Sequence, residues 1–100
     1  MSLSNDLHRM KQQALGVSVD ALAELSQIGA RRLSPYLGGT RGLPAVELER
    51  LEKTLSDLNR LAQVASPFPL SYRNVAVIRD LLERMRNGEF EMRQQHASPI

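Results

Sequence analysis

Residues 22–41 read LAELSQIGARRLSPYLGGTR, and the spacing of their apolar residues decides the predicted fold. Two helices that meet at a wide angle across a three-residue turn approach closely only where a side chain is small, and apolar residues on both sides bury the joint. Ala23 is the small residue, and Ile28 and Leu33 are apolar positions beside it. The stretch therefore predicts a helix-turn-helix with residues 27–29 as its turn.

Apolar residues recur at helical spacing on both sides of this stretch. Helices are expected over about residues 4–15, 18–27, 30–37, 44–64 and 72–87, with Ser4, Ser18 and Ser71 as N-caps. Three glycines within residues 38–42 and two prolines within residues 66–69 interrupt the pattern. Since no segment reads as a strand, we predict an all-α fold: a compact five-helix domain with the helix-turn-helix as helices two and three and an added C-terminal helix.

The first and last helices each carry an apolar stripe. In the first helix the stripe is expected to face the core, and it comprises Leu3, Leu7, Met10 and Ala14. In the last helix it comprises Val75, Ile78, Leu81, Leu82 and Met85. The last helix packs its stripe on the fourth helix, uses it to join two copies of the chain, or does both with different residues. The expected organisation is a helix-turn-helix domain over residues 1–65, a one-helix extension over residues 66–90 and a flexible tail over residues 91–100.

Composition bounds the class of protein. The 100 residues include no cysteine, and no apolar run approaches the roughly 20 residues that span a bilayer. The N-terminus lacks the order of a signal peptide, so we expect a cytoplasmic protein. His8 and His96 lie far apart without a ligand signature and are expected at the surface. We therefore expect neither an enzyme nor a bound metal or cofactor.

Charge is distributed unevenly along the chain. The net charge is only +2, yet residues 29–46 hold three arginines and no acid. A local positive surplus of this kind favours a polyanionic partner.

The motif residues resemble the Cro/lambda-repressor-like (XRE-type) helix-turn-helix family over roughly residues 5–62. Those that carry the resemblance are Ser18, Leu22-Ala23-Glu24-Leu25-Ser26, Ile28, Leu33-Ser34, Tyr36-Leu37, Gly39 and Arg41. The resemblance implies a DNA-binding transcriptional regulator of phage or mobile-element type, a repressor that binds paired half-sites as a homodimer. Its partner would be double-stranded DNA.

The resemblance also implies roles for individual residues. Arg31, Arg32 and Ser34 would face base edges or flanking phosphates. Arg41 would bind one phosphate, and the backbone N–H groups near Ser18 would bind another.

Three residues depart from the family pattern. Gln27 stands where glycine commonly allows a left-handed turn residue, and Gly29 stands where serine or threonine commonly caps the next helix. Pro35 either lies inside the recognition helix, where it removes a hydrogen bond, or follows Ser34 as the start of a much shorter helix. This unusual surface leaves a second hypothesis open, in which the same scaffold binds another protein and no longer reads DNA.

Overall fold

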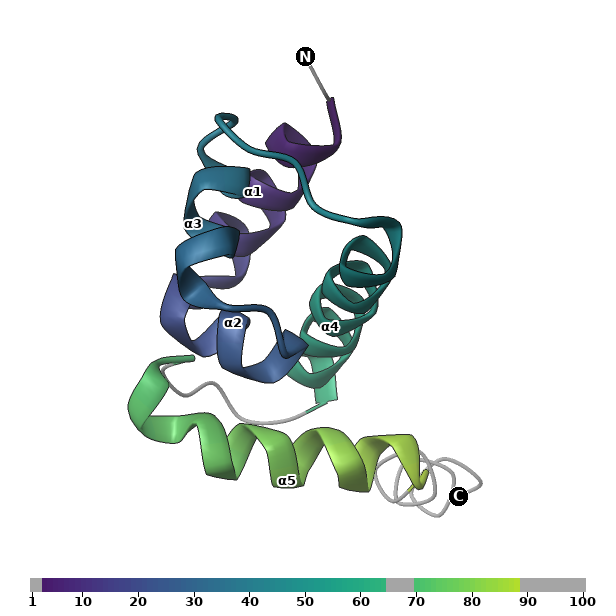
Figure 1. The fold of residues 1–100 in the computed structure, drawn as a ribbon. Coiled ribbons are helices and arrows are strands. Elements are labelled where there is room, and N and C mark those ends of the chain that lie inside the picture. Colours follow the sequence, from purple (N-terminus) through teal and green to yellow (C-terminus); the bar gives the residue numbers. More distant parts are fainter. Residues whose placement is uncertain (1–2, 65–69, 89–100) are drawn as a thin grey trace, which may run out of the picture.

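The computed structural model describes residues 3–64 and 70–88, and every regular element in these ranges is helical (Figure 1). In chain order the elements are α1 (Leu3–Leu15), α2 (Val19–Ser26), α3 (Ala30–Leu37), α4 (Ala45–Val64), the short 3₁₀ helix η1 (Tyr72–Asn74) and α5 (Val75–Arg86). The predicted all-α class is confirmed. Because α1 already begins at Leu3, Ser4 lies inside its first turn and the prediction of Ser4 as a preceding cap is wrong.

The turn between α2 and α3 has the predicted length. Ser18 caps α2 by accepting a hydrogen bond from the Ala21 amide at 3.2 Å. After Ser26, the backbone of Gln27 is left-handed, with φ 59° and ψ 40°, and the Ile28 amide then donates to the Ala23 carbonyl at 3.0 Å. Gln27 therefore takes the left-handed conformation for which the family pattern commonly has glycine, and this conformation is strained for a residue with a side chain.

The structure distinguishes the two predicted arrangements of Pro35. The helix α3 begins at Ala30 and continues through Pro35 to Leu37. Pro35 has no N–H, so the Arg31 carbonyl lacks its usual donor four residues later. At the end of the helix, the backbone amide and the hydroxyl of Thr40 lie 2.9 Å and 3.2 Å from the Pro35 carbonyl and donate to it.

The core forms around α2, which packs against α3, α4 and α5, and all four of these helices contribute buried side chains; α1 packs against α3 and α4. Ala23 is buried at the joint, as predicted from its size, and Tyr36 and Leu37 are both buried. The most deeply buried large side chains include Leu22, Leu33, Leu51, Leu58, Leu61 and Ile78.

The predicted orientation of α1 is wrong. Leu7 and Met10 face solvent with 54% and 62% of their surface exposed, whereas Asn5 and His8 are buried. The reason is a specific polar contact: Nδ1 of His8 lies 2.6 Å from the Tyr36 hydroxyl of α3. A buried polar group that is hydrogen-bonded costs little, so α1 can bury the face that its apolar periodicity did not favour.

The C-terminal helix packs on the rest of the chain. In Figure 1, α5 lies across the ends of α2 and α4, and both contacts are close. Its buried residues are Val75, Ile78, Leu82 and Met85, with Leu81 half-buried. Polar contacts also hold the extension: the Ser18 amide donates to the Leu70 carbonyl at 2.9 Å, Arg86 donates to Asp57 at 2.8 Å, and Arg79 donates to Glu24 at 3.4 Å. The stripe therefore packs within the chain, against α2 and α4.

Two details complete the description of the fold. Ser71 precedes η1, but its side chain makes no capping hydrogen bond, contrary to expectation. The connector over residues 66–69, the tail over residues 91–100 and His96 lie outside the described residues. Among the described residues, no helix combines the length and apolarity that crossing a membrane requires.

Candidate nucleic-acid interface

The outer face of α3 carries the first group of predicted contact residues. Arg31 and Ser34 are three residues apart, so they lie on the same side of the helix, and both are exposed. Across residues 3–64 and 70–88, the Arg31 guanidinium makes no ion pair or hydrogen bond. Its charge is therefore available to an external anion.

Arg41 lies beyond the opposite end of α3. The eight residues of this helix span about 12 Å, so Arg31 and Arg41 mark a stretch of surface rather than one point. Arg41 is exposed and lines a shallow hollow together with Tyr36 and the loop from Gly39 to Leu43. Two separated cations, one near each end of α3, suit an extended polyanion better than a small compact anion.

Ser18 begins α2 but is only partly available for an external contact. Its hydroxyl already accepts from Ala21, and its amide donates to the Leu70 carbonyl. The backbone N–H groups that remain open in the first turn belong to Val19 and Asp20. Because the Asp20 carboxylate is exposed beside them, it opposes an incoming phosphate at this point.

Arg32 is bound within the chain. Its Nη1 donates to Oε2 of Glu47 at 2.7 Å, and its Nη2 lies 2.7 Å from Oε1 of the same carboxylate. The second contact is an ion pair without hydrogen-bond geometry, and the Arg32 Nε is buried without a partner. Arg32 and Arg31 are sequence neighbours, yet only Arg31 presents a free guanidinium.

Arg50 completes this network from the next turn of α4. It donates to the carbonyls of Ser26 and Gln27 at 3.2 Å and 2.9 Å, and its guanidinium lies 3.8 Å from the Glu47 carboxylate. Sequence reasoning missed both α4 residues. The available signal was that Glu47 is the first acid after the acid-free residues 29–46.

A polar cluster of His8, Tyr36 and Glu52 connects α1, α3 and α4; His8 and Tyr36 are buried, whereas the Glu52 side chain is 63% exposed. Besides its contact with Tyr36, His8 places Nε2 3.6 Å from the Glu52 carboxylate. Because a carboxylate only accepts, this geometry assigns the ring proton to Nε2, and the Tyr36 hydroxyl then donates to Nδ1. Burial lowers the pKa of His8, although Glu52 opposes that shift, and burial raises the pKa of Tyr36. The surface position expected for His8 is therefore wrong.

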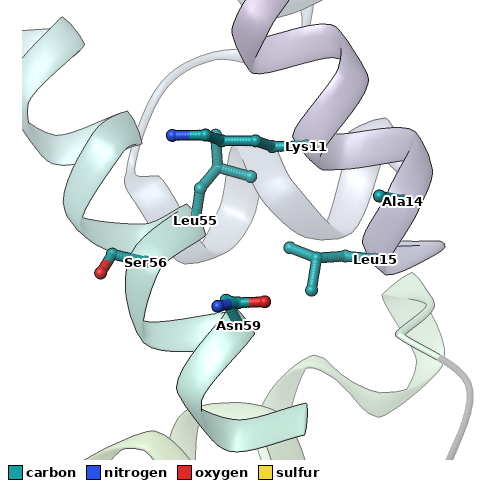
Figure 2. A pocket seen from close by; sticks show the side chains of 6 residues that line it. All are labelled: Lys11, Ala14, Leu15, Leu55, Ser56 and Asn59. Atoms are coloured by element: carbon teal, nitrogen blue, oxygen red, sulfur yellow. The ribbon is translucent and has the colours of Figure 1, made fainter. Parts of the chain in front are cut away.

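A second hollow lies between α1 and α4, as Figure 2 shows. It has a volume of about 310 Å³ and is lined by Lys11, Ala14, Leu15, Leu55, Ser56 and Asn59. Lys11 is its one titratable lining residue, which is a poor basis for acid–base chemistry. Among the described residues, no group of three or more His, Cys, Asp or Glu side chains could hold a metal ion.

Comparison of the chain with protein-family models, with curated proteins and with solved structures finds no match.

Proposed function

We propose that the chain is a sequence-specific DNA-binding transcriptional regulator, a repressor of phage or mobile-element type, that binds the major groove with α3. The observation that carries the proposal is the free Arg31 guanidinium beside Ser34 on the outer face of α3. Helices α2 and α3 meet across a three-residue turn, the arrangement in which a second helix can enter the major groove.

The proposed contacts divide by role. Arg31 and Ser34 face base edges, where an arginine bidentate to guanine contributes about 1–3 kcal/mol of discrimination. Arg41 binds a phosphate beyond the end of α3, and the first amides of α2 after Ser18 bind another. Binding as a homodimer to paired half-sites would supply the affinity that one eight-residue helix cannot.

A second candidate function is a protein-interaction module. It is favoured by the outward apolar face of α1, where Leu7 and Met10 are exposed, and by the exposed Asp20 near the proposed phosphate contact. A partner protein would cover the apolar face of α1, whereas DNA would not.

The test is duplex binding measured by fluorescence anisotropy across a salt titration. The probes are a duplex that the wild-type chain selects from a random pool and an unselected duplex. We expect the affinity to fall steeply with salt. The logarithm of the binding constant falls linearly with the logarithm of the salt concentration, and each neutralised phosphate adds about 0.9 to the steepness of this line, the salt slope. Arg31→Ala should weaken binding to the selected duplex by roughly 10-fold or more and leave the helical circular dichroism signal unchanged.

The matched control is Lys53→Ala, which removes one exposed positive charge from the far side of α4. This variant should bind the selected duplex nearly as tightly as the wild type. If the wild-type chain binds no duplex even at low salt, the proposed function is wrong and the protein-interaction candidate replaces it.

A further inference from the structure

The third helix has little intrinsic means of holding its position. It is eight residues long, it lacks a side-chain cap at Gly29, and Pro35 removes one of its internal hydrogen bonds. Isolated helices shorter than about 12 residues are marginal in water. The orientation of α3 therefore depends on contacts with other elements.

Two residues of α4 supply such contacts on both sides of the turn. Glu47 binds Arg32, the third residue of α3, through both carboxylate oxygens at 2.7 Å. Arg50 binds the Ser26 carbonyl at the end of α2 and the Gln27 carbonyl in the turn. We call Arg32, Glu47 and Arg50 the α4 clamp.

The clamp residues supply hydrogen bonds and charge where α2 and α3 have no partner of their own. The last carbonyls of a helix have no partner within it, and Arg50 provides one for α2. The side chain of Glu47 is only 14% exposed, so its attraction for Arg32 is screened less than that of a surface pair. Nη2 of Arg50 also lies 3.8 Å from Oε2 of Glu47. The contact with α3 and the contacts with the end of α2 and the turn are therefore made from adjacent positions on the longest helix.

We propose that Glu47 and Arg50 are positioning residues, which hold α3 at the angle needed for DNA binding, and that Arg32 acts through Glu47 rather than by contacting DNA. This inference rests on the proposed function. It reassigns one of the two adjacent arginines: Arg31 contacts the target, and Arg32 orients the helix that carries Arg31.

The substitution Glu47→Gln distinguishes a positioning role of Glu47 from direct DNA contact by Arg32, because the two hypotheses predict opposite changes in DNA affinity. If Arg32 contacted DNA, the substitution would free it, remove a repelling charge and tighten binding. If Glu47 positions α3, the substitution weakens binding to the selected duplex by at least about five-fold. Glu49→Gln removes the same charge from an exposed site two residues away and should not weaken binding.

The salt slope gives a second readout that a general loss of structure would not produce. Arg41→Ala should lower the slope by about 1, since it removes a phosphate contact. Arg32→Ala should weaken binding without changing the slope, and combining it with Glu47→Gln should add little, because both changes remove one interaction. A slope lowered by Arg32→Ala, or binding tightened by Glu47→Gln, would overturn the inference.

Backbone amide hydrogen exchange tests the clamp without DNA. In folded Glu47→Gln, the amides of α3 should exchange faster than in the wild type, while those of α5 keep their protection. Unchanged exchange in α3 would contradict the clamp. Faster exchange in α3 with no duplex binding by the wild type would instead retain the structural clamp and reject both its DNA role and the proposed function.

Discussion

His8 is a titratable side chain held between two groups of different chemistry. The Tyr36 hydroxyl is 2.6 Å from Nδ1, and the Glu52 carboxylate is 3.6 Å from Nε2. Lys11 is the other charge that acts on the ring, and it disfavours protonation. Protonating Nδ1 would replace the acceptor of the Tyr36 hydrogen bond with a second donor. The neutral ring therefore fits the folded chain.

This geometry predicts a pH-dependent stability. Because burial lowers the pKa of His8 in the folded chain below its usual 6.5, the unfolded chain takes up a proton first as the pH falls. The stabilisation is present in full above the unfolded pKa and is lost as the pH falls toward the folded pKa. We expect the free energy of unfolding, measured with urea, to be lower at about pH 5.5 than at about pH 7.5.

His8→Gln serves as the comparison, because glutamine can accept from Tyr36 but does not titrate in this range. Its loss of stability over the same interval should be smaller than that of the wild type. Equal losses in the two chains would show that a group other than His8 causes the effect.

At the scale of the element, α3 retains a residue that its helix does not favour. Pro35 costs roughly 3 kcal/mol through the missing hydrogen bond, and its rigidity in the unfolded chain returns up to about 1 kcal/mol. Thermal unfolding followed by circular dichroism should therefore show Pro35→Ala to be more stable by about 2 kcal/mol. If Pro35→Ala unfolded at the same midpoint temperature as the wild type, water would fully replace the hydrogen bond that the Arg31 carbonyl lacks.

The first helix shows why an apolar stripe did not determine which side of the element is buried. Its stripe includes Leu7 and Met10, but the face that carries His8 can bond to Tyr36. Helical periodicity identifies a helix and its two faces, yet the choice between those faces depends on the partner that packs against it.

At the scale of the whole molecule, α5 is part of the core rather than an accessory. Ile78 is fully buried, and Val77 next to it is 55% exposed. Ile78→Ala should lower the free energy of unfolding by about 2–4 kcal/mol, because it leaves a cavity against α2 and α4. Urea unfolding of Val77→Ala should differ from the wild type by no more than about 0.5 kcal/mol.

Urea unfolding of Ile78→Ala and Val77→Ala also tests whether the chain unfolds as one unit. If Ile78→Ala destabilised only α5, two transitions would replace one, and helices α1 to α4 would unfold at the wild-type midpoint. A single transition at lower urea agrees with the contacts of α5 on two helices.

By itself, the sequence determined the helices and the turn. Apolar spacing predicted the five helices, and residues 27–29 form the turn that Ala23 and Ile28 indicated. These features depend on residues close in the chain, where periodicity, breakers and caps act directly.

Only the tertiary structure decided which face of α1 is buried and which arginine of α3 is free. Arg32 and Glu47 are 15 residues apart, and His8 and Tyr36 are 28 residues apart. No local pattern encodes such pairings, because they arise when packed helices bring distant polar groups within hydrogen-bond range and water no longer competes for them.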